Sequence, residues 1–369
     1  MGRRRIWIIG AQSVIVAMLL LAAILSPGPE DIWLLSILGF LVNSGTAFQD
    51  VSIDSLAVDI MPENERAKAA GVMFGGQVLG ISASTFFGGQ QIAIYGTVAG
   101  YLTAALIVTC VLILGIVIRE REGERHFPWS DGAAHPLNVT LQVEAWKPLL
   151  INSWKAMLAP LSLVALIIFF VRTMPSGIAE AYHPGLATNI GGWTQTSYTN
   201  TISAAQFAVG LFALTLGGWA VAKIGAQRAA LILCLLVSFF AISFGLARDY
   251  WSNASLLVAY FWQIEFLTVM LTVAFVPIAM RLCNPRVAAT QFTLYMAASN
   301  VGRPLGNSVA AAADEMGAPH LMYFVLAGVF VALSLILWFA RFPKKAPEVV
   351  KIIEESEPIV EGEPPPKID

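Results

Sequence analysis

Charge is what this sequence has least of. Only 12% of its 369 residues are Asp, Glu, Lys or Arg, whereas soluble globular proteins carry about 25%. The formal net charge is −2, so the chain lacks the basic surface by which proteins bind nucleic acid. With 57% hydrophobic residues, these shortages exclude a soluble domain and a nucleic-acid-binding protein. They indicate an integral membrane protein.

Residues that bind metals or attack substrates are also scarce. The three cysteines lie far apart, in or beside apolar runs, without the spacing of a metal site or a disulfide framework. The four histidines, His183 among them, are expected in loops or at the ends of spans. A membrane enzyme needs a nucleophile and base, or metal ligands, at membrane depth. We therefore expect no metal site, no cofactor and no enzymatic activity.

Long apolar runs fill most of the chain instead. A membrane-spanning helix needs about 20 predominantly apolar residues, and lipid offers backbone groups no hydrogen-bonding partner, so the runs are predicted to be helices. We expect ten spans, at 6–26, 32–59, 67–92, 97–118, 157–175, 194–219, 229–247, 252–280, 287–312 and 320–341.

The positive charges give an orientation. Cytoplasmic loops carry an excess of Lys and Arg. With the N-terminus in the cytoplasm, all of the 22 Lys and Arg residues are cytoplasmic except Arg172, Arg248 and Arg303. We therefore predict a multi-pass membrane protein with both termini in the cytoplasm.

Two segments separate from the spans. Residues 119–156 are charged and form the longest loop, whose end, with Trp146 and Trp154, is expected to lie at the membrane surface. Residues 342–369 are rich in proline and glutamate and are expected to be disordered. The predicted organisation is an N-terminal half (1–118), a cytoplasmic linker (119–156), a C-terminal half (157–341) and a tail.

The two halves repeat each other in the same direction. The segment Asn64–Ala70 resembles Asn284–Thr290 at an offset of 220, and Gly2–Arg5 resembles Gly225–Arg228 at an offset of 223. The second repeat has six spans and the first four, so we expect about two spans to be missing before Met1. The alternative is a chance match between short cytoplasmic turns. Parallel repeats joined by a long loop are typical of secondary transporters, which bind substrate between the repeats.

One loop carries a family resemblance. The run Gly217–Arg228 resembles the Gly-x-x-x-Asp-Arg-x-Gly-x-Arg loop of the major facilitator superfamily, with Ala222 in place of the aspartate. Gly2–Arg5 resembles the tail of the same loop in the other half. The resemblance implies an all-α fold of two bundles, here with four and six helices, and a monomer. It also implies gates on the cytoplasmic side at Arg3, Arg4, Gly218, Lys223, Gly225 and Arg228.

A second motif narrows the resemblance. The run Gln49–Arg66, with Gln-Asp-x-x-x-Asp followed by Asp-x-x-Pro-x-x-x-Arg, resembles the muropeptide permease and acetyl-coenzyme A transporter branch of that superfamily. The branch implies a proton-driven carrier of bulky polar solutes in the bacterial inner membrane. Asp59 and Arg66 are interpreted as a further pair at the cytoplasmic gate.

Acidic residues inside spans call for an explanation, because a charge at the centre of a membrane helix costs about 2.5–3.5 kcal/mol. Asp50 and Asp54 are four residues apart and share one helix face with Asn43. Two interpretations stay open: coupling to protons or substrate, and a structural or gating role. Glu265 is the only acidic residue within its span, and Arg303 is its expected counter-charge.

Polar residues on three spans are expected to face a shared cavity. In 287–312 they recur every four residues, which predicts a polar stripe on one face of the helix. The expected substrate-cavity residues are Asn43, Gln195, Thr199, Gln206, Trp262, Tyr295 and Ser299. Arg172, placed before Pro175 at the outer end of its span, is expected to extend to the membrane surface. Gly71, Gly75, Gly76 and Gly80 are expected to pack against another helix.

Two functions remain open. The leading one is a secondary active transporter that moves a polar or amphiphilic small molecule, with protons as the coupling ion. The alternative is a truncated, non-transporting membrane protein that acts in pigment or lipid handling or in assembly, which the missing spans favour.

Overall fold

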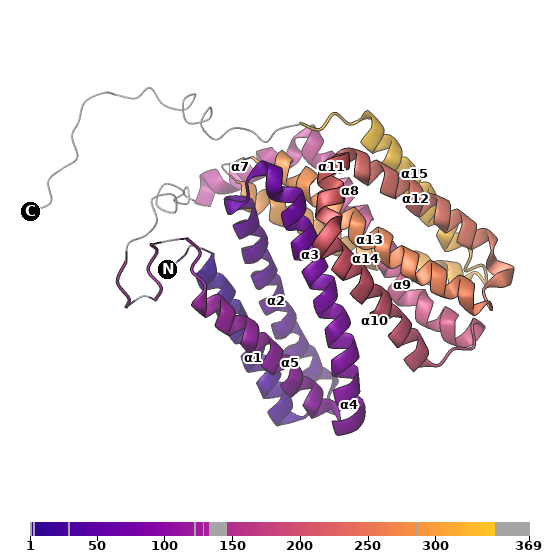
Figure 1. Cartoon of the computed structure of the whole chain (residues 1–369), viewed down its shortest axis with the longest axis horizontal. Helices are drawn as coiled ribbons and strands as arrows, with labels where there is room; N and C mark the ends of the chain where they lie inside the picture. Colours follow the sequence, from indigo (N-terminus) through magenta and orange to yellow (C-terminus); the bar gives the residue numbers. More distant parts are fainter. Residues whose placement is uncertain are drawn as a thin grey trace, which may run out of the picture.

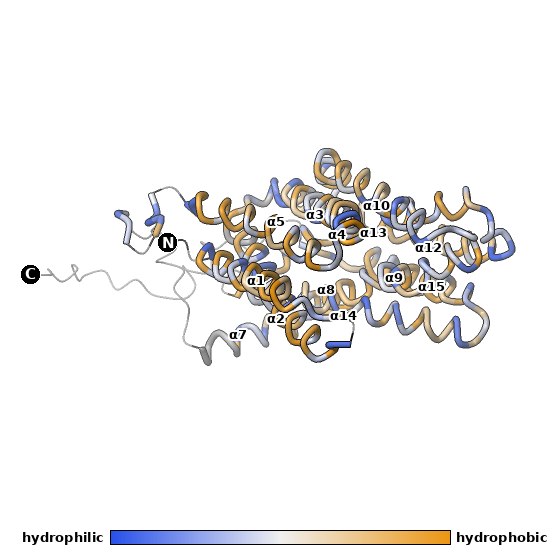
Figure 2. The backbone as a smooth tube through the Cα atoms, turned by 90° about the horizontal axis from the view of Figure 1, so that it is seen from below, coloured by the Kyte–Doolittle hydropathy of each residue, from blue (hydrophilic) through white to orange (hydrophobic). Residues whose placement is uncertain are grey.

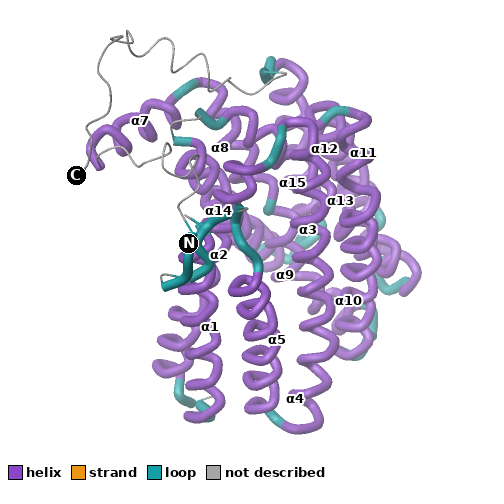
Figure 3. Tube along the Cα trace, turned by 60° about the vertical axis from the view of Figure 1, so that its left-hand side comes forward, coloured by secondary structure: helices purple, strands orange, loops and turns teal. Residues whose placement is uncertain are grey.

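The computed structural model describes residues 2, 4–28, 30–121, 123–127, 129–132, 146–284 and 287–343, and helices make up nearly all of its regular structure (Figure 3). The helices run roughly side by side, and their hydropathy is highest along their lengths and lowest where the chain turns (Figure 2). The fold is therefore all-α, as the apolar runs predicted. The predicted tail falls outside the described residues beyond Pro343.

The first part of the chain contributes the helices α1 (Arg5–Leu25), α2 (Ile32–Ile60), α3 (Arg66–Ala83), α4 (Gly89–Tyr95) and α5 (Thr97–Val117). A short turn of helix, η1 (Glu63–Glu65), precedes α3, and a π-helical turn, η2 (Ser84–Gly88), joins α3 to α4. α1 packs between α2 and α5, whereas α3 packs chiefly on α10 (Gln195–Phe212), α11 (Gly218–Ile224) and α13 (Ala254–Leu282) of the second part (Figure 1). α3 is thus the main structural link between the two parts.

The second part begins with α7 (Trp146–Leu158), α8 (Pro160–Arg172), α9 (Met174–Gly185), η3 (Leu186–Ile190), α10 (Gln195–Phe212), η4 (Ala213–Gly217) and α11 (Gly218–Ile224). It continues with α12 (Ala226–Leu246), η5 (Arg248–Tyr250), α13 (Ala254–Leu282), α14 (Ala288–Glu315) and α15 (Leu321–Phe339). Its first helix, α7, begins inside the segment predicted as a loop at 119–156 and extends two residues beyond it. Trp154 on α7 is exposed.

Nine of the described helical segments are long and apolar enough to cross a bilayer. The remaining predicted span, 287–312, corresponds to α14, whose 28 residues reach about 42 Å at 1.5 Å per residue. α14 is less apolar because it carries Gln291, Asn300, Arg303 and Asn307. It packs against α8, α9 and α2, so neighbouring helices cover much of its surface.

The fifth span is longer than the sequence predicted. It runs from Pro160 to Ile190 through α8, α9 and η3, whereas we expected it to end at 175. Pro175 stands in the first turn of α9, where a helix needs no backbone N–H, so it restarts a helix rather than ending the span. His183 is therefore not in a loop: it lies in α9 and is 1% exposed.

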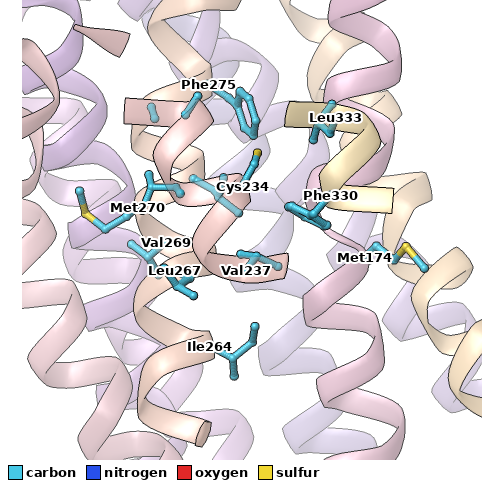
Figure 4. Close-up of a cluster of buried hydrophobic side chains, with 14 of the residues drawn as sticks. Met174, Cys234, Val237, Ile264, Leu267, Val269, Met270, Phe275, Phe330 and Leu333 are labelled. Atoms are coloured by element: carbon cyan, nitrogen blue, oxygen red, sulfur yellow. The ribbon is translucent and has the colours of Figure 1, made fainter. Parts of the chain in front are cut away.

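The main core lies in the second part. α13 is 78% buried along its most apolar window, whereas the windows of α2 and α5 are 11% and 6% buried. Side chains of α9, α12, α13 and α15, including Met174, Cys234, Phe275 and Phe330, meet in this core (Figure 4). The second part is therefore a packed bundle, and α2 and α5 leave large apolar surfaces that lipid or other helices can cover.

Candidate functional site

A cavity of about 520 Å³ lies between the two parts of the chain. Residues of α2 and α3 form one side of it, and residues of α9, α10, α13 and α14 form the other, together with Arg172 at the end of α8. Its polar wall includes Asp50, Asp54, Gln77, Arg172, Glu180, Gln206, Glu265, Thr268, Thr272, Ser299, Asn300 and Arg303. Four carboxyl groups and two guanidinium groups thus share one space within the helical bundle.

Asp50 and Asp54 reach this cavity from α2. The two residues are one helical turn apart, and both line the cavity, as their shared face predicted. Asp54 is buried, at 8% exposure, whereas Asp50 is exposed. It is unfavourable for two neighbouring carboxyl groups to be charged at the same time. A buried carboxyl group next to a second one is therefore suited to exchanging a proton.

Arg172 lies inside the cavity and not at the membrane surface. Its side chain is 7% exposed, and its Nη1 donates a hydrogen bond of 2.5 Å to Thr272 Oγ1 on α13. Its guanidinium carbon lies 5.1 Å from the centre of the Phe169 ring. Its Nε is buried without a hydrogen-bond partner among the described residues. The expected extension to the surface is wrong, because the span continues beyond Pro175 to Ile190 and places Arg172 within it.

Arg303 pairs with Glu180 and not with Glu265, the partner expected from the sequence. Its Nη1 lies 3.4 Å from Glu180 Oε1 on α9. The sequence predicts a loop after 175, whereas the helix that continues past Pro175 brings Glu180 to Arg303. Both Arg303 and Glu180 are about half exposed, at 55% and 53%, so the pair borders open cavity space.

Glu265 lines the same cavity from α13. Its carboxyl group interacts with the side chain of Gln206 on α10, which lines the same cavity. Thr268, one turn further along α13, also lines the cavity, as does Thr272. Glu265 thus has a neutral polar partner, and Arg303 acts on it only through longer-range electrostatics.

Two further residues of the predicted cavity set line it, Gln206 and Ser299. Tyr295 does not: it is completely buried, and its hydroxyl accepts a hydrogen bond of 2.8 Å from Gln291 Nε2. The predicted stripe on α14 is not straight, because each step of four residues turns an α-helix by about 40° beyond a full circle. Gln291 therefore faces Ser162 on α8, whereas Ser299 and Arg303 reach the cavity.

The remaining predicted cavity residues lie elsewhere. Asn43 is exposed, and its Nδ2 donates to Gly39 O over 2.8 Å in its own helix. Trp262 is 39% exposed and does not line the cavity. Gln195 is exposed at the first residue of α10, and Thr199 does not line the cavity, although its neighbour Tyr198 does. Thr199 therefore lies on another face of α10 than Tyr198 and Gln206.

The predicted gate residues have mainly structural contacts. Arg66 Nη1 donates to Met280 O at the end of α13 over 3.2 Å. Lys223 lies 5.0 Å from the Trp219 ring, Gly225 has a φ of +93° between α11 and α12, and Arg228 is exposed. The backbone N–H of Arg4 donates to Glu120 Oε2 over 2.8 Å. Arg3 and the side chain of Asp59 lie outside the described residues.

Glycines hold α3 against α10 and α11. A Cβ placed on Gly71 would come within 2.7 Å of Gly218 N, and one on Gly218 within 2.5 Å of Ala67 O. Gly75 likewise lies against the backbone of Leu214. The expected packing role is therefore present for Gly71 and Gly75, whereas Gly76 and Gly80 face open space. Gly218 is part of this contact.

Comparison with known proteins agrees with this architecture. The family model described as Major Facilitator Superfamily matches residues 1–307. Anhydromuropeptide permease of Escherichia coli K12 is 26% identical over 320 residues, which is 82% of this chain and 59% of the permease. The permease of Escherichia coli O157:H7 gives the same figures. The chain thus spans less than two thirds of the length of these relatives.

A solved structure shares the fold. The human organic anion transporter MFSD10 (TETRAN) superposes with a TM-score of 0.67 at 12% sequence identity, covering 90% of this chain and 77% of the transporter. At this identity the likeness concerns the fold alone.

Proposed function

The chain belongs to the Major Facilitator Superfamily, and we propose that it is a secondary active transporter driven by protons. The observation that carries the proposal is the cavity between the two parts, which holds four carboxyl groups and two arginines. Ionisable groups within membrane spans are costly and mark the pathways of substrates and protons. A cavity between repeats is where secondary transporters bind their substrates.

The charges suit a polar solute that carries an anionic group. Arg172 is buried and keeps one N–H group without a hydrogen-bond partner among the described residues. An arginine presents several donors that match a carboxylate or phosphate. The name of the E. coli relatives makes an anhydromuropeptide the first candidate substrate to test.

Glu265 is the proposed proton carrier. It lies on the cavity wall with a neutral partner, Gln206, instead of an ion pair, so it can gain or lose a proton without breaking a salt bridge. Protonation would alter its interaction with Gln206 on α10, and a ligand or proton that favours one arrangement shifts the balance between conformations. Asp54 is a second carboxyl group on the opposite side of the same cavity.

Uptake by reconstituted protein tests the proposal. Liposomes that contain the full chain should accumulate a labelled anhydromuropeptide when the pH gradient points inward. The variant Glu265→Gln should lose accumulation while it still exchanges internal for external substrate. Glu315→Gln, at the exposed end of α14, is the matched control and should behave like the wild type. Accumulation by Glu265→Gln would refute the coupling role. A stable wild-type chain that shows neither uptake nor exchange across polar solutes would favour the non-transporting alternative.

A further inference from the structure

A second cavity lies at one end of the second part, where α11 turns into α12 and where α13 and α15 end. Its volume is about 740 Å³, and it shares no lining residue with the central cavity. Arg228 and Arg281 line it, and none of the described residues that line it is acidic. The cavity therefore attracts anions and lies outside the transport site.

The rest of the wall is largely apolar. Leu231 and Ile232 of α12, Ile278 of α13, and Leu337 and Trp338 of α15 line the cavity. Trp338 is 71% exposed, and tryptophan is enriched at the level of lipid headgroups. The wall thus combines two cations at the end of a helical bundle with a surface that can receive a hydrocarbon chain.

A comparison with the first part shows that Arg228 is not needed to hydrogen-bond the carbonyl groups at the end of a neighbouring helix. Arg5, its counterpart in the repeat, is 4% exposed and donates to Gly115 O over 2.9 Å, to His126 O over 2.7 Å, and to Ile116 O. It thereby satisfies carbonyl groups at the end of α5, which have no partner within the helix.

In the second part, a different residue hydrogen-bonds the carbonyl groups at the end of the corresponding helix. Gln227 Nε2 donates to Leu337 O and to Ala340 O at the end of α15, each over 2.8 Å. Arg228 is left exposed on the cavity wall. The repeat position that is structural in one half is therefore available for a ligand in the other.

We propose that this cavity binds the headgroup of an anionic phospholipid from the adjoining leaflet, with its phosphate at Arg228 and Arg281 and an acyl chain along Ile232 and Trp338. Basic pockets between membrane helices bind anionic headgroups in this way. The apolar wall and the exposed Trp338 favour a lipid over a soluble phosphate, which would leave that surface uncovered. By the distribution of Lys and Arg, this leaflet is the cytoplasmic one.

Native mass spectrometry of the full chain in detergent tests this proposal. The protein is titrated with phosphatidylglycerol and, separately, with phosphatidylcholine of the same acyl chains. We expect phosphatidylglycerol to bind more tightly, and Arg228→Gln to weaken its binding about fivefold, since one Arg near an anionic surface contributes about 1 kcal/mol. Arg248→Gln is the matched control: Arg248 is exposed at the opposite end of α12 and should leave binding unchanged.

Two further measurements separate the possible ligands. Trp338→Ala should weaken phosphatidylglycerol binding while the melting temperature stays that of the wild type. Inorganic phosphate alone, at millimolar concentration, should not displace the lipid. Equal binding of the two lipids, or unchanged binding by Arg228→Gln, would overturn the proposal. Full displacement by inorganic phosphate would overturn it as well, because the site would then take a soluble anion.

Discussion

Arg303 on α14 and Glu180 on α9 form an ion pair at the central cavity, with 3.4 Å between Nη1 and Oε1. The pair joins two helices that also cross closely, since a Cβ on Gly177 would meet the backbone of Arg303 and Asn307. Packing therefore holds the two backbones together, and the ion pair is not needed for this contact and can act in the cavity.

The first prediction separates these roles. Because both side chains of the pair are about half exposed, the ion pair should contribute at most about 1 kcal/mol to stability. Glu180→Gln, Arg303→Gln and the double variant should therefore melt close to the wild type, whereas each should reduce uptake strongly. Melting in detergent and uptake into liposomes are measured on the same preparations. A coupling free energy of several kcal/mol, or full uptake by the double variant, would contradict this assignment.

The second prediction concerns the glycines of α3. Gly75→Ala places a Cβ against the backbone of Leu214, whereas Gly76→Ala meets nothing within 4 Å. Overpacking costs about 1–3 kcal/mol, and alanine in an open helix position gains up to about 1 kcal/mol over glycine. Gly75→Ala should therefore lower the melting temperature, and Gly76→Ala should keep or raise it. The two variants differ by one position and serve as controls for each other. Equal melting temperatures would show that α3 does not need its close approach to the second part.

Several features of the site could be predicted from the sequence, because residue types that are unfavourable in a membrane span stand out in an apolar run. Asp50, Asp54 and Glu265 interrupt apolar runs, and a membrane span accepts such residues only where they face polar surroundings. Gly71 and Gly75 repeat at the spacing of a helix–helix contact. In both cases the chemistry of single residues, combined with the helical period, determines where they lie.

Other features could not be predicted, because they depend on how a helix continues or turns. A proline after an apolar run, such as Pro175, is compatible with a loop or with the first turn of a new helix, and only packing decides between the two. If the span ended at Pro175, Glu180 would lie in a loop and Arg172 at the membrane surface. An extension of the helical pattern past Pro175, with Ile178 and Tyr182 four residues apart, was the available signal. The prediction that the polar stripe on α14 faces one cavity was wrong, because the stripe rotates gradually around the helix and so separates Tyr295 from Arg303.

The third prediction tests the orientation. Lys and Arg are concentrated at the end of the molecule that holds α11, the turn into α12 and the end of α15, which predicts that this end faces the cytoplasm. A green fluorescent protein fused after residue 369 should therefore fluoresce. Alkaline phosphatase inserted at Asn253, in the turn between η5 and α13, should be active, because that enzyme needs the oxidising side of the membrane. The reverse pattern would invert the topology.

The last prediction concerns Arg172 as the group that binds the anionic part of the substrate. Arg172→Gln removes the charge from the cavity and should raise KM for an anionic solute at least about tenfold, since a charge-assisted hydrogen bond is worth roughly 1.5–3 kcal/mol and 1.4 kcal/mol is a factor of ten. Thr272→Val is the control, because it removes the hydroxyl that accepts from Arg172 Nη1 and keeps the charge. It should change KM less. The decisive comparison uses the same solute with its acid converted to a neutral amide, for which Arg172→Gln and the wild type should have similar KM values. An equal rise in KM for the acid and the amide would mean that Arg172 shapes the cavity and does not bind the anion.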